Sequence, residues 1–164
     1  MKLALITDIH ANREAFEACI EQAHLHGADR LAFLGDFVGY GADPAWVVER
    51  VQDLVAQGAI AVRGNHDEAV ARGASQHLVE DARRVIEWTR AQLTPEQLDF
   101  LGALPYTRED LGCLFVHANA VAPSGWDYVL GRTEAVRSMM ATDCRHSFCG
   151  HVHQPALYHL SSTG

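Results

Sequence analysis

The fold is decided by the stretch Leu3-Ala4-Leu5-Ile6-Thr7-Asp8-Ile9-His10 near the N-terminus. Its continuous apolar run, residues 3–6, predicts a strand that is buried on both faces of a sheet. Asp8 and His10 follow this strand, two positions apart. Side chains two positions apart on an extended chain point to the same side, so both can reach one point. The stretch therefore predicts a buried strand that leads into a polar site.

Two apolar runs further along the chain repeat this arrangement. Residues 30–34 predict a second buried strand, and Gly35-Asp36 follows it directly. Residues 59–63 predict a third strand, and Gly64-Asn65-His66-Asp67 follows it. Each of the three strands thus ends in a short polar segment.

Helical patterns lie between these three strands. They cover residues 13–26, behind the capping residue Asn12, and residues 44–57, behind Asp43. Later helices are expected over 78–93, over 95–104 behind a capping box of Thr94 and Gln97, and over 132–140. Hairpin strands are expected over 106–109 and 113–117, and further strands over 147–149 and 156–160. Strands alternating with helices predict an α/β fold around a mainly parallel sheet. A length of 164 residues favours a single domain over residues 1–164.

The remaining polar segments also follow predicted strands. His117 ends the fifth strand, and Gly150-His151-Val152-His153 follows the sixth. Because ligands of open α/β sheets bind at the carboxyl ends of the strands, we expect one site at this edge. Its candidate residues are Asp8, His10, Asp36, Asn65, His117, His151 and His153.

The chemistry of these seven side chains indicates metal ions. Carboxylate, amide and imidazole donors without sulfur suit manganese, iron, zinc, nickel or cobalt, and they suit calcium or magnesium less well. Seven donors exceed the needs of one tetrahedral ion. They fit two ions that share a carboxylate at a separation of about 3.5–4 Å. We expect two divalent transition-metal ions, with manganese as the first choice.

Composition narrows the class of protein. Hydrophobic residues make up 48% and charged residues 21% of the chain, which is typical of a globular protein. The apolar runs are too short for a membrane span or a signal peptide, so we expect a cytoplasmic protein without a membrane partner. A net charge of −8 argues against a general nucleic-acid binder, so nucleic acid is expected only as a phosphodiester substrate.

The five motifs, in this order, resemble those of the calcineurin-like metallophosphoesterases. They are Asp8-Ile9-His10, Gly35-Asp36, Gly64-Asn65-His66-Asp67, His117 and Gly150-His151-Val152-His153. The segment Gly35-Asp36-Phe37-Val38-Gly39-Tyr40-Gly41 is most similar to the small bacterial and archaeal members that lack a cap domain. The resemblance covers nearly the whole chain and implies a two-layered sheet core with flanking helices.

The resemblance also implies a role for each residue. Asp8, His10 and His153 would hold the first metal ion, Asn65, His117 and His151 the second, and Asp36 would bridge them. His66 would orient the phosphate or protonate the leaving group, and Asp67 could hold His66 in the required tautomer.

The implied activity is the hydrolysis of phosphate diesters or monoesters, by a phosphodiesterase or a phosphatase. Two cations lower the pKa of a bridging water, so that hydroxide can attack phosphorus in line with the leaving oxygen. The partner is then a small phosphate ester. A non-catalytic scaffold or binding module on the same fold is the alternative from another class of protein, although His66 and every expected ligand are present.

Two departures from the family bear on these expectations. Serine/threonine protein phosphatases read GDxxDRG after the second strand, whereas Gly39 and Tyr40 stand at the last Asp and Arg here. Arg63 does match the arginine that those phosphatases place on the phosphate, so a protein phosphatase stays an alternative and Arg63 a candidate phosphate contact.

The chain also ends soon after His153, whereas family members usually continue with more strands. It is therefore either truncated or closed by a hairpin or a partner, and an exposed final strand would favour a homodimer.

Overall fold

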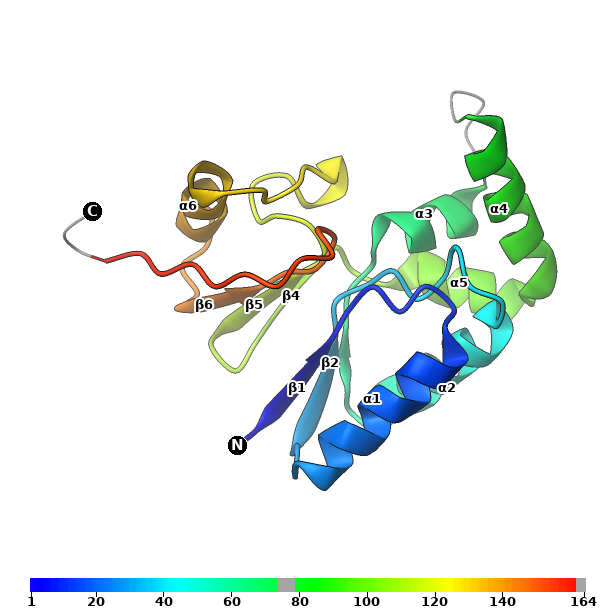
Figure 1. The fold of residues 1–164 in the computed structure, drawn as a ribbon, viewed down its shortest axis with the longest axis horizontal. Helices are drawn as coiled ribbons and strands as arrows, with labels where there is room; N and C mark the ends of the chain where they lie inside the picture. Colours follow the sequence, from blue (N-terminus) through cyan, green and yellow to red (C-terminus); the bar gives the residue numbers. More distant parts are fainter. Residues whose placement is uncertain (74–78, 162–164) are drawn as a thin grey trace.

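The computed structural model describes residues 1–73 and 79–161, drawn in Figure 1. It is a mixed α/β structure, as the sequence predicts, and its strands form two sheets of three strands each. The strands are β1 (Leu3–Ile6), β2 (Arg30–Phe33), β3 (Ile60–Ala61), β4 (Thr107–Asp110), β5 (Cys113–Val116) and β6 (His146–Phe148). The helices are α1 (Arg13–Leu25), α2 (Pro44–Ala56), α3 (Asn65–Arg72), α4 (Glu80–Gln92), α5 (Pro95–Ala103), the short η1 (Pro123–Gly125) and α6 (Arg132–Met140).

The first sheet is parallel, in the order β1-β2-β3. Strand β2 lies in its centre and is covered on both faces. Leu31 and Phe33 belong to the core that the helices form against the sheet, whereas Ala32 and Leu34 belong to a second core with Phe115 of β5. This confirms the predicted buried strand at residues 30–34. It also means that the two sheets pack face to face, with α1 and α2 on the outer side of the first sheet (Figure 1).

Strand β1 differs from the prediction, because it lies at the edge of its sheet and one of its side chains is exposed. Ala4 and Ile6 pack against the helical core, and Leu3 packs against the core between the sheets. Leu5 points to the same side as Leu3 but stays 41% exposed. The second sheet therefore covers only one end of β1.

Local signals place α1 and α2 as predicted. The Asn12 side chain caps α1 by accepting a hydrogen bond from the amide of Ala15 at 3.0 Å. Helix α2 begins at Pro44, where a missing amide proton costs nothing. Phe16 of α1 and Val47 of α2 are fully buried against the sheet. Burial of each such side chain contributes roughly 1.5–3 kcal/mol, which fixes the helices under the strands.

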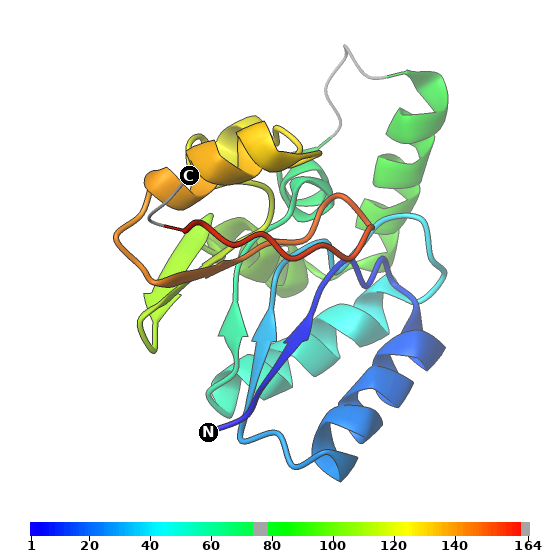
Figure 2. The ribbon, with the colours of Figure 1, turned by 60° about the vertical axis from the view of Figure 1, so that its left-hand side comes forward.

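The second sheet combines a hairpin with a parallel strand. Strands β4 and β5 are antiparallel around Leu111 and Gly112, whose φ angles of 57° and 70° are those of a tight two-residue turn. Strand β6 pairs with β5 in parallel. The prediction of a further strand over residues 156–160 is wrong, since that segment forms no strand (Figure 2). Leu157 is 96% exposed, so the segment buries no apolar face that would hold it in a sheet.

Helix α3 was not predicted, because its first turn carries the polar residues of a motif. The acid at the third helical position, Asp67, caps the helix by accepting the amide of Gly64 at 2.9 Å. Helix α4 begins at Glu80, whereas the prediction began at Leu78, which lies outside the described residues. Helix α5 has the predicted capping box of Thr94 and Gln97.

Candidate metal centre

The loops that follow strands of both sheets come together beyond the ends of those strands (Figure 2), and the predicted ligands lie in these loops or at their ends. Both sheets contribute. Asp8 and His10 follow β1, Asp36 follows β2, and Asn65 begins α3 behind β3. The second sheet supplies the rest, with His117 after β5 and the pair His151 and His153 after β6.

One cluster contains Asp8, His10 and His153. Their ligand atoms all lie within 4.8 Å of one another. His153 Nε2 is 3.1 Å from Asp8 Oδ1 and 3.2 Å from His10 Nε2. This is the group of three residues that the family resemblance assigns to the first ion.

A second cluster surrounds His117, whose side chain is fully buried. Its Nε2 atom lies 3.2 Å from Asn65 Oδ1, 3.1 Å from His151 Nδ1 and 3.3 Å from Asp36 Oδ2. The same Asp36 Oδ2 atom is 3.8 Å from His10 Nε2 in the first cluster. Asp36 therefore lies between the two clusters, where a bridging carboxylate would be required.

Hydrogen bonds at the far side of the imidazole rings decide which nitrogen faces the clusters. His117 Nδ1 lies 2.7 Å from the Leu34 carbonyl oxygen, and His10 Nδ1 lies 3.1 Å from that of Val38. A carbonyl oxygen only accepts, so these ring nitrogens carry the protons. In a neutral ring the opposite nitrogen then presents a lone pair.

His151 has the same arrangement with its ring reversed, since Nε2 donates to the Trp126 carbonyl oxygen at 2.9 Å. Two lone pairs, on His117 and His151, therefore face each other at 3.1 Å, next to the side-chain oxygens of Asp36 and Asn65. Acceptors in this arrangement repel unless a cation or a proton lies between them. The donor set thus fits divalent transition metals, and carbonyl-anchored histidines are typical of metal sites.

The backbone at the ligands is left-handed, which corrects the extended geometry that the spacing suggested. Asp8, His10, Asp36, His151 and His153 all have φ between 48° and 68°. Such conformations are uncommon for residues other than glycine, and they cluster at functional sites. Asp8 and His10 reach one point because the chain turns sharply after β1 and not because it continues as a strand.

Asp67 anchors the backbone, and its contacts do not support the prediction that it orients the His66 ring. Its fully buried carboxylate accepts four amide protons, from Asp36, Phe37 and Val38 at 2.8–3.3 Å and from Gly64 at 2.9 Å. These bonds join the loop after β2 to the start of α3. Asp67 therefore holds Asp36 and Asn65 in place by fixing the two segments that carry them.

Burial and charge shift the pKa values of the cluster. Burial opposes ionisation of Asp36, but the hydrogen bond from His117 and its charge outweigh it, so the pKa of Asp36 is lowered. Burial likewise opposes protonation of His117, yet its contact with Asp36 raises the pKa of His117. Burial and the nearby His117 lower the pKa of His151. Burial and the charge of Asp36 raise the pKa of Asp67 to about 7.

His66 lies beside the first cluster. A nitrogen of its ring is within 4.8 Å of the ligand atoms of His10 and Asp36. Tyr40, 70% exposed, packs on both histidines, with ring centroids 4.7 Å from His10 and 4.6 Å from His66. A Cβ atom on Gly39 would lie 2.5 Å from His66 Nδ1, so only glycine leaves room for this ring. Burial lowers the pKa of His66, which leaves the ring neutral near pH 7.

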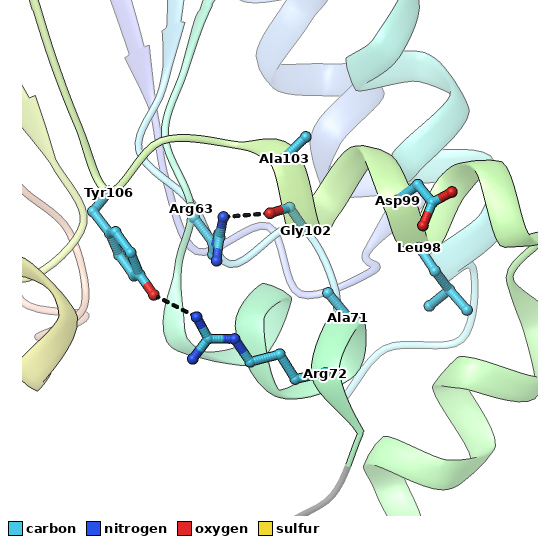
Figure 3. A pocket seen from close by; sticks show the side chains of 8 residues that line it. All are labelled: Arg63, Ala71, Arg72, Leu98, Asp99, Gly102, Ala103 and Tyr106. Atoms are coloured by element: carbon cyan, nitrogen blue, oxygen red, sulfur yellow. Dashed lines mark hydrogen bonds between the residues drawn. The ribbon is translucent and has the colours of Figure 1, made fainter.

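Arg63 faces away from the clusters. Its side chain is buried, donates from Nε to the Leu104 carbonyl oxygen at 3.0 Å and from Nη2 to that of Gly102, and lies over the Tyr106 ring (Figure 3). These contacts hold α5 in place and do not support the predicted contact with phosphate. Arg63 borders a cavity of about 480 Å³, which is lined by Arg63, Ala71, Arg72, Leu98, Asp99, Gly102, Ala103 and Tyr106.

Two residues near the second cluster were missed by the sequence analysis. The Tyr128 ring stacks on the His151 ring at 4.1 Å with an interplanar angle of 8°. Glu68 accepts a hydrogen bond from Trp126 Nε1 at 3.1 Å. Neither lies in a motif with recognisable spacing. The position of Glu68, one turn after Asn65 on a helix, was the only signal that could have pointed to it.

Comparisons with known proteins agree with this geometry. The sequence profile of the calcineurin-like phosphoesterase superfamily domain matches residues 1–163. An uncharacterised protein of Methanocaldococcus jannaschii is 35% identical over 132 residues, which cover 77% of this chain and 53% of that protein. The chain therefore spans about half the length of the curated relative it matches.

Within the described residues, no helix has the length and apolar character needed to cross a membrane.

Solved structures show the same fold. A metallophosphoesterase from Sphaerobacter thermophilus is 36% identical with a TM-score of 0.81, over 93% of this chain and 61% of the other. A hypothetical protein from Pyrococcus horikoshii has a TM-score of 0.69 at 19% identity, over 84% of this chain and 64% of the other. The profile match across nearly every residue establishes that this chain belongs to the calcineurin-like phosphoesterase superfamily.

Proposed function

We propose that the protein is a metal-dependent phosphoester hydrolase with two divalent ions at the carboxyl ends of its strands. The observation that supports this most directly is the pair of lone pairs on His117 and His151, which face each other at 3.1 Å beside Asp36 and Asn65. When both rings are neutral, a protein gains nothing in stability from such an arrangement of acceptors. A cation between them turns the repulsion into coordination.

The proposed ligands follow the two clusters. Asp8, His10 and His153 would hold one ion, and Asn65, His117 and His151 the other, with Asp36 shared between them. Ions bound there would lower the pKa of a water molecule and neutralise phosphate oxygens. Manganese remains our first choice, ahead of iron, nickel, zinc and cobalt. Because both sheets contribute donors, we propose that residues 1–164 act as one domain.

The chain's own residues would position the substrate. His66 projects beside Asp36 from the start of α3, and its neutral ring can donate one N–H to a phosphate oxygen. The lowered pKa of His66 favours the orienting role over protonation of the leaving group, because it disfavours the imidazolium form of the ring. Tyr40 confines the His66 ring from the solvent side and offers an exposed aromatic surface next to the reaction site.

The substrate class we propose is a small phosphate diester or monoester. The protein serine/threonine phosphatase alternative is less well supported, because Arg63 is engaged by backbone carbonyls of α5 and not directed at the clusters. The scaffold alternative would not need His66 or a full set of seven donors. A cytoplasmic location and a homodimer remain predictions of the sequence.

Hydrolysis of chromogenic phosphate mono- and diesters tests the proposal. Metal-stripped protein is compared with protein reloaded with Mn²⁺, Ni²⁺, Zn²⁺ or Mg²⁺. Asn65→Ala removes one donor, and His24→Ala, on α1 and outside the clusters, is the matched control. We expect metal-dependent turnover that Asn65→Ala loses and His24→Ala keeps. Folded protein that turns over no ester with any of these metals would favour the scaffold.

A further inference from the structure

A buried network behind the second cluster is not used by the proposed chemistry. At its centre is Glu68 on α3, whose residue is 9% exposed. Its Oε1 atom accepts the Tyr106 hydroxyl proton and pairs with Arg72, each at 2.5 Å, and Arg63 Nη1 lies 3.7 Å away. Its Oε2 atom accepts the indole N–H of Trp126 at 3.1 Å. The two oxygens thus have different partners.

Trp126 connects this network to a candidate ligand. While its indole is bound to Glu68, its backbone carbonyl oxygen accepts the Nε2 proton of His151 at 2.9 Å. The indole and the carbonyl belong to one residue, so the bond to Glu68 restrains the position of the residue whose carbonyl holds His151. Trp126 has φ 60° and ψ 25°, a left-handed conformation that is unfavourable without such an anchor.

The loop around Trp126 is restrained from its other side by Asn119. The Asn119 side chain accepts the amides of Val121 and Ala122 at 2.9 Å each and donates to the Asp127 carbonyl oxygen at 2.9 Å. These bonds order the loop but do not involve the Trp126 side chain. The Trp126 ring packs near Tyr106 and His117, with ring centroids at 5.7 and 5.9 Å, and Glu68 accepts its indole N–H.

We infer that the Glu68–Trp126 pair is a positioning element for His151, and through it for the second of the two proposed metal sites. The carbonyl of Trp126 holds the proton of His151 on Nε2, so that Nδ1 faces His117 as a lone pair. The inference rests on the proposed function only where it speaks of metal. The first cluster has no part in this network, because His10 is anchored by the Val38 carbonyl.

The first test needs no metal. Trp126→Phe removes the indole N–H but keeps an aromatic ring, and Glu68 retains Tyr106 and its arginines. Long-range ¹H–¹⁵N correlations of the metal-stripped protein, recorded at a pH high enough that His117 is neutral, report which nitrogen of His151 carries the proton. We expect the Nε2–H tautomer in the native protein and a mixture in Trp126→Phe. An unchanged tautomer in the variant would overturn the inference, whatever the protein does with metals.

The second test separates the two sites. Calorimetric titration of stripped protein with Mn²⁺ should resolve two binding events. Losing a group that orients a metal-bound histidine typically costs roughly 10- to 100-fold in affinity, so Trp126→Phe should weaken one event by that factor and leave the other unchanged. Trp88→Phe, on α4, is the matched control and should leave both unchanged. Equal weakening of both events in Trp126→Phe would show a general structural effect and contradict the inference.

Glu68→Ala is a second variant, which is used alone if Trp126→Phe folds poorly and in a double-mutant cycle otherwise. Glu68→Ala removes the acceptor from the other side of the same bond. If the two residues act on His151 through that bond, the double variant should show no greater change in tautomer than the more affected single variant. Fully additive effects would mean that they act independently, which overturns the pairing. Native protein that binds fewer than two Mn²⁺ ions would refute the dinuclear proposal, while the tautomer result would still decide the inference.

Discussion

His117 Nε2 and His151 Nδ1 face each other at 3.1 Å, and each ring donates its other N–H to a backbone carbonyl. In the metal-free protein this contact is tolerable when one ring is protonated. The raised pKa of His117, caused by Asp36, and the lowered pKa of His151 indicate that His117 carries that proton. An ion that enters the second cluster must displace it.

The stabilisation by metal should therefore grow with pH. The raised pKa of His117 means that its proton stabilises the metal-free fold below the unfolded pKa of about 6.5, and that this contribution is lost as the pH rises through the folded pKa. The pKa of Asp67 is raised from 3.8 to about 7, so the stability of the metal-free fold also falls as this carboxyl group loses its proton. At about 100 times Kd, Mn²⁺ should add about 2.7 kcal/mol per site at high pH and less at low pH. Melting temperatures with and without Mn²⁺ measure this, and a metal effect that shrinks as the pH rises would contradict it.

Asp67→Asn should destabilise the fold and impair the site together. The amide group of asparagine would face backbone N–H groups that now donate to a carboxylate, so at least one buried donor loses its partner. We expect a loss of about 2–4 kcal/mol in the free energy of unfolding, measured by urea denaturation of the metal-free protein. Asp99→Asn, at an exposed position on α5, is the control. A native-like stability of Asp67→Asn would refute the anchoring role.

His66→Asn should lower kcat without releasing the metal. If His66 positions the phosphate with a neutral N–H, the loss should be similar for good and poor leaving groups, and roughly 10- to 1000-fold by analogy with other transition-state donors. Rates with aryl and alkyl phosphodiesters measure this, together with the metal content of the variant. A loss that is confined to the alkyl ester would instead identify His66 as the acid that protonates the leaving oxygen.

Arg63→Ala should act on stability and not on the binding of small substrates. Its guanidinium holds the carbonyls at the end of α5, so its removal leaves buried acceptors unpaired and should cost about 2–3 kcal/mol. At a temperature where the variant is folded, KM for a small phosphate ester should match that of the native protein. An increased KM at unchanged stability would instead support the contact between Arg63 and phosphate that the sequence predicts.

The sequence predicted the elements and the site where signals are local. Asn12, Pro44 and the Thr94 capping box mark helix ends through contacts within a few residues, and these are confirmed. The strand over residues 156–160 was predicted from apolar content alone, and whether an apolar segment finds a partner depends on the rest of the fold.

Prediction of the site from sequence is limited in the same way, because part of its geometry depends on the rest of the fold. The motif residues converge as predicted, but through left-handed turns that residue spacing does not reveal. Arg63 stands next to a motif and points away from it, because its partners at Gly102 and Leu104 are distant in sequence. Glu68 was not predicted as a site residue, yet it lies near the second cluster through its contact with Trp126, which is 58 positions away in the sequence. Contacts of this kind depend on tertiary structure.

The division of ligands between the two sheets also has a consequence for synthesis. Asp8 and His10 leave the ribosome early, whereas His117, His151 and His153 appear only after most of the chain has been made. Each proposed ion would take ligands from loops of both sheets, so a nascent chain that has exposed only the first sheet would offer each ion an incomplete set. Metal capture would thereby be deferred until the loop that carries His151 and His153 has been added, and an occupied centre would mark a chain whose two sheets have both formed.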